Sequence, residues 1–191
     1  FRCWNELQLR YGVAPCVLMG ILNERGIAAA CELDITNAVM MRAMGLAANW
    51  PVVLLDVNNN YKDDMNKGIF FHCGPAPISM MEGKGVIEQH LMFKKSYGDG
   101  SGVGLNVGKL IRGDVAVGSF KTEDGNLCAF VTEGKFTEDE IPEEFFGMGA
   151  VFEKENANEM FNYMARNGYR HHAAITKGNW AESVREAFDN Y

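Results

Sequence analysis

The chain has 191 residues, 47% of them hydrophobic and 23% charged, and a formal net charge of −7 at pH 7. This composition is that of an ordinary globular protein, long enough for one large or two small domains. The negative charge argues against a nucleic-acid partner. No apolar run approaches the roughly 20 residues that a membrane span needs, and no secretory signal is visible.

The five cysteines are scattered along the chain without a Cys-x-x-Cys pair. This pattern argues against a disulfide scaffold or a thiolate zinc site, and we expect reduced thiols in a cytoplasmic protein. The first residue is Phe and not Met. We therefore expect the chain to be either a fragment of a longer protein or a trimmed product.

The first third of the chain predicts two helices and two strands in alternation. Apolar residues recur at helical spacing from Pro15 to Gly26 and again from Asp34 to the break at Pro51. Each of these helices is followed or preceded by a short apolar run, over residues 27–31 and 52–57. This order predicts a parallel α/β sheet, with Asp34 or Thr36 as the N-cap of the second helix.

Each of the two apolar runs ends in a carboxylate, Glu32 in the first and Asp56 in the second. The carboxyl ends of strands in an open α/β sheet are where ligands bind. Two carboxylates at that edge could hold a hard divalent cation or transfer protons. The histidine-bearing stretches around His72 and His171-His172 are their natural complements.

The rest of the chain predicts mainly antiparallel β structure. Short apolar segments occur at residues 69–72 and 103–136, and Asp124-Gly125 predicts a tight hairpin turn. Gly102-x-Gly104 is not followed by a helical pattern, which argues against a dinucleotide-binding loop. A helix over residues 156–167, a strand over 171–176 and a final helix from Trp180 complete the predicted small β-barrel domain.

At this point the sequence resembles the L-fucose isomerase family and, more distantly, the L-arabinose isomerases. The resemblance extends over nearly the whole chain, and the order of its motifs is more specific than any one of them. They are Cys3-Trp4-x-Glu6-Leu7-Gln8, Gly12-x-Ala14-Pro15-Cys16, Cys31-Glu32-Leu33-Asp34-Ile35-x-x-Ala38, Leu55-Asp56, Phe71-His72-Cys73-Gly74-x-x-Pro77-x-Ser79 and His171-His172.

The resemblance implies that residues 1–60 are the end of a Rossmann-like α/β domain and that residues 61–191 form the C-terminal β-barrel domain. It implies a homo-oligomer and a Mn²⁺ ion, with Mg²⁺ or another divalent cation as the alternative. The ligands would be Glu32, Asp56 and one of His171 and His172. In aldose–ketose isomerisation through an ene-diol, Glu32 and Asp56 would also be the catalytic acid–base pair.

Several residues keep more than one interpretation. His171 and His172 are adjacent in a predicted strand, so we expect them to point to opposite faces and only one to face the metal. His72 is more typical of a strand histidine with its hydrogen bonds satisfied than of a ligand. Possible sugar contacts are Gln8, Ser79 and Asn167.

Three functions compete on the sequence alone. The first is a metal-dependent sugar isomerase or its C-terminal portion, which can be inactive when isolated. The second is a non-catalytic carbohydrate-binding or regulatory fragment. The third is a structural domain whose carboxylates only cap helices, and the presence of Glu32, Asp56 and the histidine pair argues against it. The sequence does not specify the sugar.

Overall fold

The structure is a computed structural model that describes residues 2–190, without the side chains of Trp4, Asn5 and Asn59. Phe1 and the Trp4 side chain of the opening motif therefore lie outside the description. The helices are η1 (Cys3–Leu7), α1 (Gln8–Tyr11), α2 (Cys16–Glu24), α3 (Ile35–Ala48), η2 (Ile78–Met80), α4 (Leu91–Tyr97), α5 (Ala157–Arg166) and α6 (Ala181–Asp189). The strands are β1 (Val52–Tyr61), β2 (Asp64–His72), β3 (Val86–Gln89), β4 (Val103–Lys109), β5 (Gly113–Glu123), β6 (Asn126–Phe136), β7 (Met148–Glu153) and β8 (His172–Lys177).

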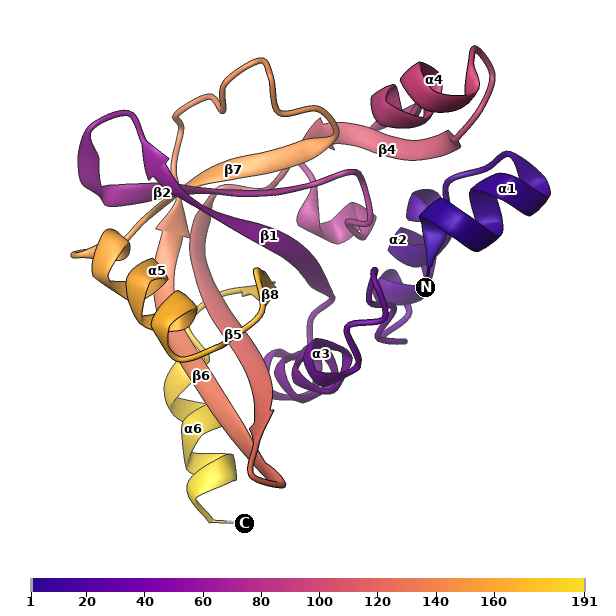
Figure 1. The fold of residues 1–191 in the computed structure, drawn as a ribbon. Helices are drawn as coiled ribbons and strands as arrows, with labels where there is room; N and C mark the ends of the chain where they lie inside the picture. Colours follow the sequence, from indigo (N-terminus) through magenta and orange to yellow (C-terminus); the bar gives the residue numbers. More distant parts are fainter. Residues whose placement is uncertain (1, 191) are drawn as a thin grey trace.

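The described strands form one mixed sheet in the order β2-β1-β8-β5-β6-β7-β4-β3. An additional pairing of β2 with β7 brings the first six strands into a ring, which is visible in Figure 1. All pairings between these strands are antiparallel except β4 with β7. Strands β6 and β7 pair only at Lys135–Glu153 and Phe136–Phe152, so the strands form a ring, and the β-barrel stays a prediction.

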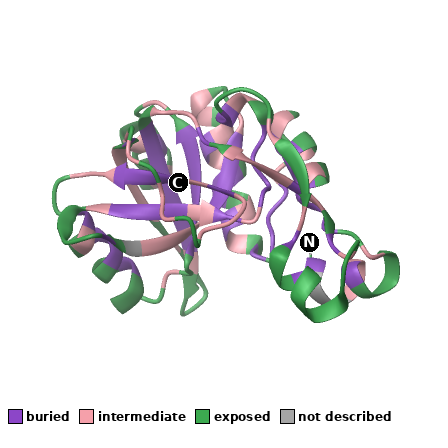
Figure 2. Ribbon diagram, turned by 90° about the horizontal axis from the view of Figure 1, so that it is seen from above, coloured by how far each residue is buried: buried purple, intermediate pink, exposed green. Residues whose placement is uncertain are grey.

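Both faces of the first half of strand β1, residues 52–55, are buried, which explains why this segment reads as a continuous apolar run. Val53 and Leu55 belong to a core that also contains Phe70 and Phe152, whose ring centroids lie 5.1 Å apart. Leu54 packs with residues of α3, among them Met40 and Met44, in a second core. Successive strand residues point to opposite faces, so one strand supplies both cores. Figure 2 shows the buried strands at the centre and exposed helical surfaces around them.

Two predictions for the first third of the chain are wrong. Residues 27–30 form no strand, and at Ala29 a side chain takes the place of a strand partner: Asn23 Oδ1 accepts the Ala29 amide at 2.8 Å. Strand β1 pairs antiparallel with both β2 and β8 and is not in a parallel sheet. The division at residue 60 and the Rossmann-like origin of residues 1–60 stay predictions.

The other elements agree with the sequence pattern. The Asp124-Gly125 hairpin is confirmed: Glu123 faces Asn126, and both turn residues have positive φ, 50° and 81°. Asp34 caps α3 by accepting the amide of Asn37. Within residues 2–190, no helix combines the length and apolar character needed to cross a bilayer.

Candidate functional site

The register between β1 and β8 brings Asp56 and His172 together. These two residues are direct partners in the antiparallel ladder, and Asp56 Oδ1 lies 3.3 Å from His172 Nε2. Asp56 lies in the middle of β1 and not at its end, as the apolar run had suggested. Pairing with a distant strand, and not a shared strand end, therefore builds this half of the site.

His171 reaches the same carboxylate. Its Nε2 lies 3.3 Å from Asp56 Oδ1 and 3.6 Å from Glu32 Oε2. The expectation that His171 and His172 point to opposite faces is wrong, because β8 begins at His172 and His171 lies in the bend before it. The alternation of strand side chains does not apply across that boundary.

Glu32 approaches the histidines from a turn between α2 and α3. The Asp34 amide donates to the Cys31 carbonyl at 3.0 Å and closes this turn. Glu32 and Leu33 both have left-handed backbones, with φ of 55° and 58°. Consecutive non-glycine residues in this region cost about 1 kcal/mol or more each, and such strain concentrates at functional sites. The predicted position of Glu32 at the end of a strand is thus replaced by a strained turn.

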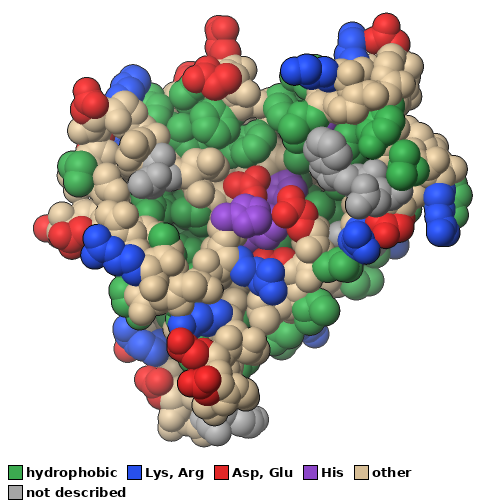
Figure 3. All heavy atoms as spheres, in the orientation of Figure 1, with side chains coloured by type: hydrophobic (Ala, Val, Ile, Leu, Met, Phe, Trp, Pro, Cys, Tyr) green, Lys and Arg blue, Asp and Glu red, His purple; other side chains and the backbone are tan. Residues whose placement is uncertain are grey.

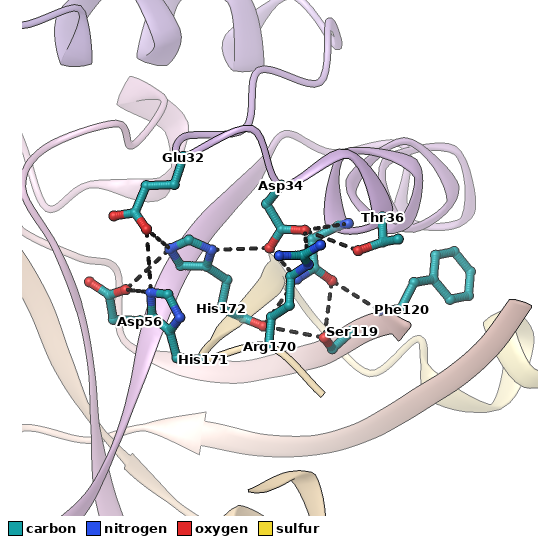
Figure 4. A network of polar contacts seen from close by, with 10 residues as sticks. Glu32, Asp34, Thr36, Asp56, Ser119, Phe120, Arg170, His171 and His172 are labelled. Carbon is teal, nitrogen blue, oxygen red and sulfur yellow. Dashed lines mark hydrogen bonds and ion pairs between the residues drawn. The ribbon is translucent and has the colours of Figure 1, made fainter. Parts of the chain in front are cut away.

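Asp34 is buried and receives hydrogen bonds from several directions (Figure 4). Its carboxylate accepts from the Asn37 amide at 3.1 Å and from Asn37 Nδ2 at 2.7 Å. It also accepts from Thr36 Oγ1 at 3.0 Å and lies 3.0 Å from His172 Nδ1 and 3.2 Å from Arg170 Nε. Asp34 therefore joins the start of α3 to His172 and Arg170.

The carboxylates around His172 favour the protonated, positively charged form of its ring. Burial opposes its charged form, but contacts with Asp34 and Asp56 outweigh burial and raise the pKa of His172 to about 9. Burial also works against the charged form of Asp34, yet hydrogen bonds from His172 and Asn37 lower its pKa to about 2. The pKa of Asp56 is lowered despite its burial, chiefly by His172. Both aspartates are therefore carboxylates at neutral pH.

His72 is a further member of the site. One of its nitrogens is satisfied, since Nδ1 accepts the Cys73 amide at 2.8 Å. Its buried Nε2 has no hydrogen-bond partner among the described residues, and the ring lies parallel to that of His172 at 5.7 Å. Burial lowers the pKa of His72 to about 4, so the ring is neutral and carries its proton on Nε2. The expectation of a fully satisfied histidine is wrong, and His72 offers a donor to a bound molecule.

The residues present fit a divalent cation. Two groups of three side chains each bring one ligand atom per residue within 4.8 Å of one another. The first is Asp56, His171 and His172, and the second is Glu32, His72 and His172. The buried Nε2 of His172 has no hydrogen-bond partner in the described chain and only an ion-pair contact with Asp56 at 3.3 Å, so it could serve as a ligand. A mixed set of carboxylate and imidazole ligands is suitable for Mn²⁺, Mg²⁺ or a similar ion.

The site opens to solvent on one face of the molecule. Glu32 and His171 are about half exposed, whereas His172 is buried. Figure 3 shows histidine atoms in the middle of this face with acidic side chains beside them. A cavity of about 230 Å³ adjoins His171 and is lined by Val57, Phe161, Met164, Tyr169 and Arg170.

The three predicted sugar contacts have other partners or none in the described chain. Ser79 donates from its amide and hydroxyl to the Glu24 carboxylate of α2. Asn167 is the C-cap of α5, and its side chain donates to the Tyr163 carbonyl at 2.8 Å. Gln8 is buried in α1, with Oε1 lacking a hydrogen-bond partner in the described chain. Their roles in sugar binding stay predictions.

Sequence reasoning considered Asp34 only as a helix cap and did not single out Asn37 or Ser119. Asn37 is fully buried, donates to the His172 carbonyl at 3.2 Å and accepts from Ser119 Oγ at 3.0 Å. An Asp at the position of Asp34 predicts only a helix N-cap, and this local signal carries no information about a site. The tertiary fold is what brings Asp34 and Asn37 against β8.

The fold and the site define a class: a mixed, mostly antiparallel sheet that carries a carboxylate–imidazole centre suited to a divalent cation. Residues 70–191 match the family described as L-fucose isomerase, C-terminal domain, and the chain belongs to this family. A sulfoquinovose isomerase of Clostridium sp. (strain MSTE9) is 32% identical over 85 residues. The match covers 41% of this chain but only 17% of that relative. The family and its relative are sugar isomerases.

Proposed function

We propose that the chain carries the metal and proton-transfer site of an aldose–ketose isomerase. The observation that supports this proposal is the convergence of Glu32 and Asp56 on the Nε2 atoms of His171 and His172. Glu32, Asp56 and one of the two histidines would hold Mn²⁺, or Mg²⁺ in its place. When bound, such a cation polarises the carbonyl and hydroxyl oxygens of a sugar and stabilises negative charge on them.

The protein residues would move the proton. Isomerisation transfers a proton between C1 and C2 through an ene-diol, and a carboxylate beside both carbons can remove the proton and return it. Asp56 is ionised and partly buried, and Glu32 faces it across the histidines. Either carboxylate therefore suits the role of base, and once it has taken the proton from one carbon it becomes the acid that returns the proton to the other. The Nε2–H of His72 would donate to a sugar oxygen.

The substrate would be a small sugar lying over His171, beside the cavity that Tyr169 and Arg170 line. L-Fucose and sulfoquinovose are the first sugars to test, because the family and the relative carry their names. We further propose a homo-oligomer in the cytoplasm, consistent with five free thiols. The half-exposed Glu32 and His171 leave room for further protein to complete the pocket.

Mn²⁺ binding measured by calorimetry tests the proposal, with Glu32→Gln beside the parent chain. Binding to the parent that is lost in the variant supports the site, and isomerase activity is then assayed with both sugars. Binding that is equal in both would remove Glu32 from the site. A chain that binds sugar and cation but never isomerises would favour the alternative, a non-catalytic carbohydrate-binding fragment.

A further inference from the structure

We propose that Asp34 is a positioning residue of the metal centre. Its carboxylate accepts a hydrogen bond from Nδ1–H of His172. This bond keeps Nε2 of the same ring directed at Asp56 and Glu32. The metal-binding consequence rests on the proposed function, whereas the hydrogen bond itself does not.

Every group around the Asp34 carboxylate is a donor. The partners of Oδ1 are the Asn37 amide, the Thr36 hydroxyl and Arg170 Nε, and those of Oδ2 are Asn37 Nδ2 and His172 Nδ1. The amide lies at the N-terminus of α3, where a negative charge is favourable. An ionised carboxylate can only accept, so the proton in its contact with His172 must belong to Nδ1.

The backbone of His172 is fixed as well as its ring. Its carbonyl accepts from Asn37 Nδ2 at 3.2 Å, and the Ser119 hydroxyl, whose single proton is shared with Asn37 Oδ1, lies at the same distance. Asn37 thus contacts both Asp34 and the His172 main chain, and it also accepts the Phe120 amide at 2.9 Å. The start of α3 and strand β5 together hold His172 in one orientation.

His171 lacks this support. Its side chain is 61% exposed, and its ion-pair contacts run through Nε2 alone. In metal sites, a carboxylate on the second ring nitrogen fixes the tautomer and orientation of the ligating imidazole. The Asp34 contact therefore selects His172 as the pre-organised imidazole, whereas His171 is an exposed ring that Asp34 does not contact.

Asp34→Asn tests this role with little change of shape. Asn is also a good N-cap, so α3 is retained. The new amide can donate to Nδ1 and so permit the other tautomer of His172. Thr36→Val is the matched control, because it removes one hydrogen bond to the same carboxylate without touching the histidine. Asp34→Ser, which also caps helices, serves as a second variant if Asp34→Asn does not fold.

Two measurements are compared in these chains. The first is the ¹H–¹⁵N spectrum of histidine-labelled, metal-free protein, which contains only four histidines. We expect an exchange-protected Nδ1 proton on His172 in the parent and Thr36→Val, and its loss in the Asp34 variants. The second is Mn²⁺ affinity, which we expect to fall roughly 10–100-fold in the Asp34 variants only.

An unprotonated Nδ1 in the parent, or a protected proton that survives the loss of Asp34, would overturn the inference. So would unchanged Mn²⁺ affinity in Asp34→Asn when the parent binds the ion. If the parent binds no Mn²⁺, the proposed function fails, but the spectra still decide whether Asp34 holds the His172 ring.

Discussion

The Nε2 atoms of His171 and His172 lie at the same distance, 3.3 Å, from Oδ1 of Asp56. Two neighbouring residues rarely present the same atom to one partner from a strand, because strand side chains alternate. Here His171 precedes the strand, although its carbonyl still accepts the Val57 amide. One carboxylate of β1 therefore holds two imidazoles of very different exposure.

Asp56→Asn should weaken Mn²⁺ binding by roughly 100-fold or more, since loss of a supporting residue alone costs 10–100-fold. The substitution preserves the shape of the side chain while it removes the negative charge beside both histidines. We expect the fold to survive, because the strand pairings of β1 use the backbone. Calorimetric titration with Mn²⁺ gives the affinity, and far-UV circular dichroism checks the fold.

Asp63→Asn is the control for this measurement. Asp63 is exposed in the turn between β1 and β2, and its substitution changes net charge by the same amount. Equal losses in Asp56→Asn and Asp63→Asn would mean that the effect is general electrostatics and not a site at Asp56.

His171→Ala and His172→Ala should differ in stability. His172→Ala leaves buried Asp34 without its imidazole partner, which should lower the free energy of unfolding by about 1–3 kcal/mol. His171→Ala removes an exposed ring and should stay within about 0.5 kcal/mol of the parent. Urea unfolding in the presence of a chelator measures both. Equal changes in the two variants would contradict the different environments of the rings.

Local signals in the sequence predicted much of the fold. Asp124-Gly125 predicted its hairpin because a tight turn needs residues that tolerate positive φ, and Asp34 predicted the start of α3. The strand predicted over residues 27–31 is absent because an apolar segment packs equally well without strand pairing. Ala29 and Ala30 are buried, but Asn23 supplies the hydrogen bonds of Ala29.

The candidate site was only half visible in the sequence. Its residue types were predicted, since carboxylates and histidines stand out among apolar neighbours. The pairing of Asp56 with His172 depends on a register between segments far apart in the chain, which no local pattern encodes. The contact of Asp34 with His172 depends likewise on the packing of α3 against β8, which brings together residues 138 positions apart.

Stability should fall as the pH rises from about 6.5 to 9 in metal-free protein. The folded pKa of His172, about 9, lies above its ordinary value of 6.5. The folded state therefore binds the proton more tightly, and its contribution is fully present below pH 6.5 and is lost as pH passes through 9. We expect a decrease on the order of 2 kcal/mol in the free energy of unfolding.

Urea unfolding at several pH values tests this dependence, with His172→Gln and His171→Gln compared with the parent. The decline should disappear in His172→Gln and persist in His171→Gln. A decline of the same size in His172→Gln would assign it to another group.

Gly147→Ala should destabilise the fold next to the site more than Gly83→Ala. Both glycines have left-handed backbones, with φ of 90° and 81°, so either substitution costs about 1 kcal/mol of strain. A Cβ at Gly147 would also lie 2.6 Å from the carbonyl oxygen of His72 and 2.5 Å from that of Cys73, whereas nothing lies within 4 Å at Gly83. Backbone oxygens cannot move aside as a flexible side chain can, so this overlap should cost about 1–3 kcal/mol more. The urea midpoint at unchanged slope measures the difference, and equal midpoints would show that β7 can shift away from His72 at no cost.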